Sequence, residues 1–133
     1  MSGADADAVR RLLAAVTKRD MDAVGAELHP EIEAHGRRGP FRGVDEVVGW
    51  AKPNDAGYLS SRVELDELRQ VGDRYVAADA RRQWCWKESG EVATEDRFGA
   101  LFEFRDGRIY RWRQDFGSII DALEAIPAER TAE

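Results

Sequence analysis

Residues 96–116 read DRFGALFEFRDGRIYRWRQDF, and this stretch predicts two β-strands joined by a tight turn. Asp106-Gly107 lies between two runs of alternating apolar residues, a setting in which an Asp-Gly pair strongly indicates a β-hairpin. In the second strand Tyr110, Trp112 and Gln114 recur at every second position, so they are expected to share one face. We expect that face to line a concavity rather than to meet water.

The rest of the chain changes from helical spacing to strand spacing of its apolar residues. Helical spacing predicts helices over residues 7–17, 20–28, 44–52 and 119–126, whereas strands are expected over residues 31–35, 61–71, 74–87, 92–105 and 108–116. Helices gathered first and antiparallel strands gathered later describe an α+β domain. The strands must curl around the helices to bury their apolar face, which predicts a cone with an internal pocket.

Length and composition fit one folded domain. The chain has 133 residues, of which 43% are hydrophobic, and we expect a single domain with its core at about residues 8–126 and a polar tail at 127–133. The formal net charge of −6 argues against a nucleic-acid partner, because such partners need a basic face. A weaker alternative is nucleic-acid binding through the arginine-rich segment 105–113.

The single cysteine, Cys85, excludes an intramolecular disulfide and a metal site built from cysteines of one chain. No run of about 18 apolar residues is present, so no membrane span is expected. Residues 1–7 are acidic and small, without the apolar core of a signal peptide. These features predict a cytoplasmic location.

Three separated motifs resemble the SnoaL-like branch of the NTF2-like superfamily. They are LHPEIEAH at residues 28–35, FRG at 41–43 with the helix that follows, and DGRIYRWRQDF at 106–116. The resemblance extends from about residue 8 to residue 126 and implies an NTF2-like, cystatin-like cone, in which a curved antiparallel sheet wraps around N-terminal helices. That superfamily includes ketosteroid isomerases, polyketide cyclases, epoxide hydrolases, dehydratases and members without known catalysis, so the fold does not select a function.

The ketosteroid isomerases of this superfamily use a tyrosine donor on the first helix and a carboxylate base on the first strand. Aligned on Arg19-Asp20, the tyrosine position falls on Leu12; aligned on Ile32-Glu33, the base position falls on Ala34. Both groups are missing. The resemblance therefore does not predict isomerase activity of that kind.

In the last strand this chain resembles the limonene epoxide hydrolases of the superfamily more closely than it resembles the ketosteroid isomerases. The arginine position of those hydrolases matches Arg81, and their two aspartate positions fall on Gln83 and Gln114. A glutamine can hold a water molecule but cannot take its proton. Either the chain lacks this chemistry, or the strand phase differs by one residue, so that Asp115 or Asp96 faces inward.

The candidate residues follow from these patterns, with ordinary structural roles as the alternative for each. His35 can act as a base near neutral pH, or simply end the first strand. The candidate catalytic residues are His35, Arg81, Asp96 and Asp115. The candidate substrate-binding residues are Tyr58, Gln83, Phe98, Phe102, Tyr110, Trp112 and Gln114.

Two functions are consistent with the sequence, which leaves open whether the protein is an enzyme. The first is binding of a small hydrophobic molecule in the internal pocket, with acid–base chemistry of isomerase, cyclase or hydrolase type that uses no metal and no organic cofactor. The second is a non-catalytic homodimer whose sheets pack through their outer faces. If Trp84 and Trp86 face outward, we expect such a dimer to form, because exposed paired tryptophans favour association.

Overall fold

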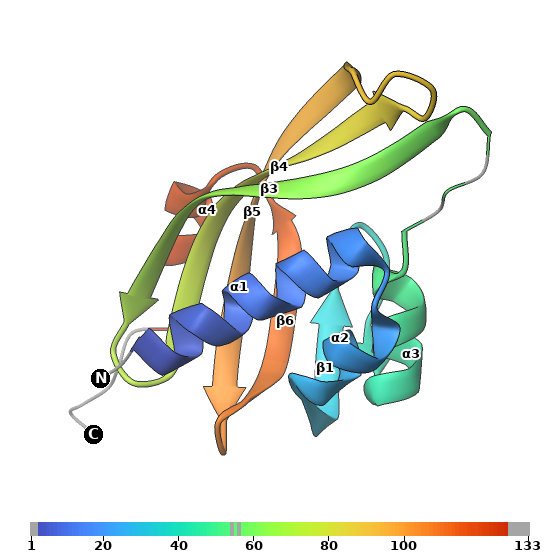
Figure 1. The fold of residues 1–133 in the computed structure, drawn as a ribbon. Coiled ribbons are helices and arrows are strands. Elements are labelled where there is room, and N and C mark those ends of the chain that lie inside the picture. The colour runs from blue at the N-terminus through green and yellow to red at the C-terminus, as the bar shows by residue number, and fades with distance from the viewer. Residues whose placement is uncertain (1–2, 54, 56, 128–133) are drawn as a thin grey trace.

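The computed structural model describes residues 3–53, 55 and 57–127, and most of the expected polar tail lies outside this part of the chain. Its elements are α1 Gly3–Lys18, α2 Met21–Ala26, β1 Leu28–His35, β2 Phe41–Arg42, α3 Val44–Ala51, β3 Leu59–Val71, β4 Tyr75–Trp86, β5 Val92–Arg105, β6 Arg108–Phe116 and α4 Ile119–Glu124 (Figure 1). The order of helices and strands confirms the expected α+β class.

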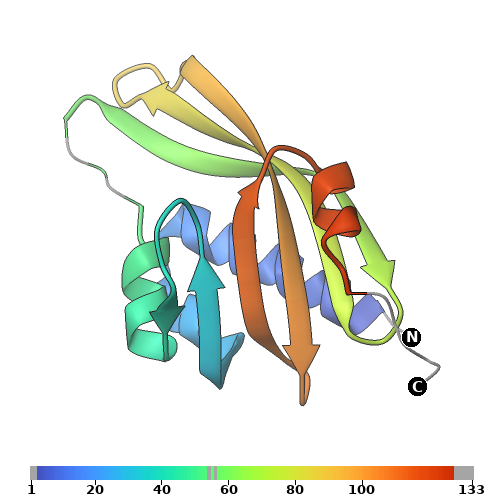
Figure 2. The ribbon, with the colours of Figure 1, turned by 180° about the vertical axis from the view of Figure 1, so that it is seen from behind.

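The strands form one curved sheet in the order β2-β1-β6-β5-β4-β3. Every neighbouring pair is antiparallel except β1 and β6, which run parallel. Helix α1 crosses the concave face of the sheet, and α2 and α3 lie beside β1 (Figure 1). Helix α4 lies on the opposite face, as the reverse view shows (Figure 2). The cone inferred from the sequence is therefore confirmed.

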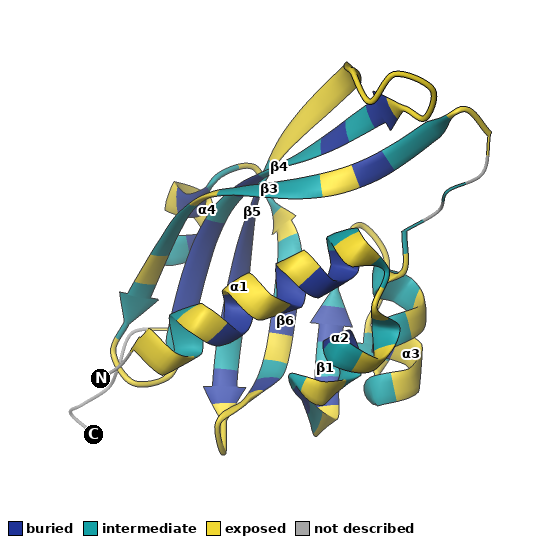
Figure 3. Ribbon diagram, in the orientation of Figure 1, coloured by how far each residue is buried: buried dark blue, intermediate teal, exposed yellow. Residues whose placement is uncertain are grey.

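The main core lies between α1 and the concave face of the sheet. Helix α1 buries Val9, Leu12, Leu13 and Val16 on the side that faces the strands, while its other side is exposed (Figure 3). The helical spacing of these residues produces this division, since positions three and four apart share one face of a helix. A smaller cluster on the convex face seats α4 against Ala77 and Leu101.

Local backbone geometry explains several element boundaries. Asp106 and Gly107 have φ values of 55° and 78°, the positive values that a two-residue type I′ hairpin turn requires. Helix α1 is followed by Arg19 in the left-handed region, with φ 62°. The side chain of Asp20 then caps α2 by accepting a hydrogen bond from the backbone N–H of Ala23 at 3.2 Å.

Several element boundaries differ from those predicted. Helix α1 begins at Gly3, four residues before the predicted start at residue 7. Strand β1 begins at Leu28, and it includes Pro30 because its ladder with β6 is irregular between residues 28 and 33. The sequence predicted no strand between residues 35 and 44, but β2 lies there and pairs with β1.

Candidate functional site

A cavity of about 470 Å³ lies between the sheet's concave face and the helices. Its wall includes the last turns of α1 and α3, the loop that follows β1, and inner-face residues of β3 to β6. The cavity is partly open to solvent, and elements that lie far apart in the sequence form its wall.

Aromatic rings form much of the wall. Trp50 of α3 meets Trp112 of β6 edge to face, with ring centroids 4.9 Å apart. Phe41 stacks on Trp50 at 5.6 Å. Gly36 permits this arrangement, because a Cβ at that position would lie 3.0 Å from the Trp50 ring. These contacts fix the position of the indoles, so the apolar wall is pre-formed.

Gln114 lies beside Trp112 on the cavity wall. The Trp112 indole N–H donates to the Gln114 Oε1 at 2.9 Å, and Trp112 is buried. The amide oxygen is thereby engaged, which leaves the amide NH2 as the group that Gln114 offers to a ligand. The position therefore supplies a hydrogen-bond donor rather than a base.

Arg82 and Asp96 are two ionisable residues on the inner sheet face that line the cavity, and Asp96 is exposed to solvent. They are directly opposite one another in the pairing of β4 with β5. The Arg82 guanidinium lies over the Phe98 ring, 5.4 Å from its centroid. Burial lowers the pKa of Arg82, the charge of Asp96 opposes that change, and the nearby charge of Arg37 lowers the pKa further.

The cavity wall carries an excess of positive charge. The cationic side chains on the inner side of this wall are those of Arg37, Arg38, Lys52 and Arg82. Among the described lining residues the acidic one is Asp96. This balance is opposite to that of the whole chain, whose formal net charge is −6.

A family model described as "SnoaL-like domain" matches residues 9–112. The chain belongs to the SnoaL-like family. No curated protein matches the sequence. The SnoaL-like fold is shared with solved structures of low sequence identity, and at such identities the likeness shows the fold alone.

One such structure is a Mycobacterium tuberculosis LEH-like epoxide hydrolase, with a TM-score of 0.70 and 20% identity over 92% of this chain and 89% of that one. Another is the Δ5-3-ketosteroid isomerase from Mycobacterium sp., with a TM-score of 0.66 and 17% identity over 90% of this chain and 95% of that one. A third, from Mycobacterium tuberculosis, is a complex with estradiol-17β-hemisuccinate, with a TM-score of 0.67 and 13% identity over 84% of this chain and 92% of that one.

Within residues 3–53, 55 and 57–127, no helix is long and apolar enough to cross a membrane. The cytoplasmic location stays a prediction from the sequence.

The prediction that Arg81 and Gln83 point inward is wrong, because β4 turns its opposite face toward the cavity. Arg81 pairs on the outer face with Asp66 at 2.9 Å and Glu95 at 3.3 Å. Gln83 donates to Glu95 at 2.8 Å on the same face. Since a strand alternates its side chains, Arg82 takes the inward position in the SnoaL-like cone.

Two further candidate catalytic residues also lie away from the cavity. Asp115 is exposed and pairs with Arg113 at 3.6 Å. His35 lies beside Glu33, 3.3 Å from its carboxylate, whereas the neighbouring Ala34 is the buried residue paired with Trp112. Strand alternation thus turns His35 outward, since Ala34 occupies the inner face.

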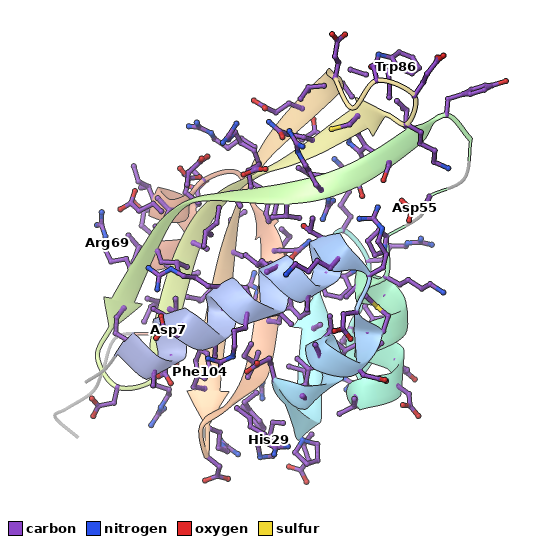
Figure 4. The ribbon with its side chains drawn as sticks, viewed as in Figure 1. Asp7, His29, Asp55, Arg69, Trp86 and Phe104 are labelled. Carbon is purple, nitrogen blue, oxygen red and sulfur yellow. The ribbon has the colours of Figure 1, made fainter. Side chains whose placement is uncertain are left out.

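The expected binding positions of Tyr58 and Tyr110 are wrong as well. Tyr58 is 83% exposed in the loop before β3, outside the main cavity. At Tyr110 a bulge breaks the ladder with β5, so Ile109 becomes the buried residue. Tyr110 instead packs at the edge of the sheet, 5.2 Å from the ring of His29. Figure 4 shows His29 at the opposite end of the molecule from Trp86.

The structure brings four predicted residues together on the cavity wall: Asp96, Phe98, Trp112 and Gln114. Phe102 lies behind them in the core, 5.7 Å from the Trp112 ring. Sequence reasoning missed Arg82 and Trp50 as site residues. The signal for Arg82 was its place on the more apolar face of β4, between Ala80 and Trp84.

Proposed function

We propose that the protein binds a small, mainly apolar molecule in the internal cavity. The cavity of about 470 Å³ carries this proposal, since small-molecule sites commonly measure about 300–1,000 Å³ and combine apolar walls with a few polar groups. Trp50, Phe98 and Trp112 supply the apolar surface, and Arg82, Asp96 and Gln114 supply the polar groups.

The chemistry proposed for this site is acid–base catalysis without a cofactor. Asp96 is the carboxylate placed to take a proton from a bound molecule or from a water. Arg82 lies opposite, where its charge stabilises negative charge that develops on a substrate oxygen. Gln114 adds a neutral donor. This arrangement supports proton transfer of isomerase or cyclase type, or hydrolysis through an activated water.

A thermal-shift screen tests the binding step with hydrophobic ketones, polyketide-like aromatics and epoxides. We expect at least one class to raise the melting temperature, because a ligand that binds the folded state stabilises it. Ala51→Phe adds bulk at the cavity wall and should abolish the shift. Ala14→Phe adds the same bulk on the exposed face of α1 and should preserve it. A screen in which no class shifts the melting temperature contradicts the proposal.

Binding without catalysis is the second candidate function. One observation favours it: among the described lining residues Asp96 supplies the carboxylate, and histidine is absent. A second acid or base for a proton relay would have to come from the substrate or from water. Turnover that survives Asp96→Asn would exclude Asp96 as the catalytic group, whereas ligand binding without turnover would support a carrier or sensor.

A homodimer through the outer sheet face remains a proposal, but its expected tryptophan contact is wrong. Trp84 lines the internal cavity, and Trp86 is 47% exposed at the end of β4. The outer face instead carries the Arg81–Asp66 and Arg81–Glu95 ion pairs. A dimer through that face should therefore weaken as salt is added. Light scattering at low and high salt tests this, and a monomer at both contradicts it.

A further inference from the structure

Arg82 is a cation on the cavity wall that forms no ion pair with any residue of the described chain, although Asp96 occupies the opposite backbone position. Its guanidinium is instead stacked over Phe98. Withdrawing a charge from water is costly unless a partner compensates it. The burial that lowers the pKa of Arg82 reflects this cost.

Arg82 has a second cation nearby, in addition to the opposing charge of Asp96. Arg37, in the loop after β1, repels Arg82 across the same cavity. Asp96 is exposed and supplies one opposing charge. The uncompensated charge is thus positive, in a chain whose formal net charge is −6. A bound anion would relieve both the repulsion and the lost hydration.

We propose that the ligand of this cavity is an apolar ring compound that carries one carboxylate, and that Arg82 binds the carboxylate. This inference rests on the proposed binding function. A guanidinium presents paired N–H donors that match the two oxygens of a carboxylate. The rings of Trp50, Phe98 and Trp112 bury the apolar part.

Asp96 limits the ligand to a single anionic group. A second carboxylate placed near β5 would meet the Asp96 charge, and like charges at short range disfavour binding. Gln114 lines this cavity and its amide NH2 is not used by Trp112, so it is suited to a neutral acceptor such as a carbonyl or hydroxyl oxygen. The site therefore distinguishes a monocarboxylate both from a dicarboxylate and from a neutral ring compound.

The test is isothermal titration calorimetry with matched acids and amides of increasing size: benzoate and benzamide, 2-naphthoate and 2-naphthamide, and 9-anthroate with its amide. The wild-type protein should bind the best-fitting acid at least tenfold more tightly than its amide. In Arg82→Met that ratio should fall to within twofold while amide affinity is kept. Arg81→Met removes the same charge one residue away on the outer face and should keep the wild-type ratio.

Each outcome decides the inference. Equal affinity for acid and amide in the wild-type protein overturns it and leaves the proposed cavity function intact. An acid preference that survives Arg82→Met also overturns it. Failure of every acid and every amide to bind overturns both proposals. If Arg82→Met does not fold, Arg82→Lys keeps the charge but loses the paired donors, and should reduce the acid preference without lowering amide affinity.

Discussion

Arg82 and Asp96 are paired positions on the inner face of the sheet, while their neighbours Arg81 and Arg97 are paired on the outer face. Outside, Arg81 is neutralised by Asp66 and Glu95. Inside, the arginine and the aspartate both line the cavity, where a ligand can lie between them and the aromatic wall. The same residue type thus stabilises the sheet on one face and is available for binding on the other.

Replacing Asp96 by Asn should separate binding from catalysis. Because the change removes the acidic charge from the cavity wall, binding of 2-naphthoate should tighten roughly two- to tenfold. Turnover of any substrate that needs Asp96 as a base should fall about 100-fold or more. Calorimetry and steady-state rates measure the two effects. Asp115→Asn, on the exposed side of β6, is the matched control and should change neither. Weaker naphthoate binding in Asp96→Asn would show that Asp96 orients Arg82 instead.

Removing the Gln114 side chain should destabilise the fold. In Gln114→Ala the buried Trp112 indole N–H loses its acceptor, which costs about 1–3 kcal/mol of unfolding free energy. Gln114→Glu retains an acceptor oxygen for the indole N–H and should cost less. Urea unfolding followed by tryptophan fluorescence measures both variants. Equal stability of Gln114→Ala and the wild-type protein would mean that water replaces the amide oxygen.

How far the sequence predicted this site depends on the element considered. The Asp106-Gly107 turn was predictable, because few residue pairs accept positive φ at both central positions. The helical spacing of Leu12 and Val16 likewise predicted which side of α1 is buried.

The phase of β4 was not decided in advance. Alternation shows that Arg81 and Gln83 share one face and that Arg82 and Trp84 share the other, but each face contains an arginine. Which face turns inward depends on packing against α1 and on the ladder with β5, both of which are tertiary contacts. The prediction for Tyr110 was wrong for a different reason. A bulge next to it changes the alternation, and no local signal in the sequence marks that bulge.

The Arg19–Asp55 pair should make stability depend on acid pH. Arg19 Nε donates to Asp55 at 2.7 Å and joins the end of α1 to the loop between α3 and β3, where Figure 4 labels Asp55. The hydrogen bond from Arg19 lowers the pKa of Asp55 below its ordinary value of 3.8. A depressed folded-state pKa stabilises the protein above that ordinary value, and the contribution is lost as pH falls through the folded-state pKa.

Asp55→Asn should therefore lower stability at pH 7 and have a smaller effect at pH 2.5, where the carboxyl is protonated in the unfolded chain. The loss at pH 7 should stay within about 1 kcal/mol, since the pair is partly exposed to water. Urea unfolding at the two pH values measures it. Asp73→Asn, in the exposed turn between β3 and β4, serves as the control and should show no such difference. An effect of Asp55→Asn that is the same at both pH values would contradict the ionic origin.

Gly99 should be the least replaceable glycine of the described sheet, because α4 approaches the convex face directly over it. A Cβ built at Gly99 would lie 2.0 Å from the carbonyl oxygen of Ser118, the residue that caps α4. Backbone cannot yield as a flexible side chain does, so Gly99→Ala should displace α4 and cost about 1–3 kcal/mol.

Gly49→Ala is the matched control for Gly99→Ala. Gly49 lies inside α3 with no atom within 4 Å of its added Cβ, so the same substitution should stabilise the protein by up to about 1 kcal/mol. Urea unfolding of the two variants gives opposite signs if the close approach of Ser118 is the cause. Equal stability of Gly99→Ala and wild type would mean that α4 shifts without loss, and that its contacts with Ala77 and Leu101 contribute little to the fold.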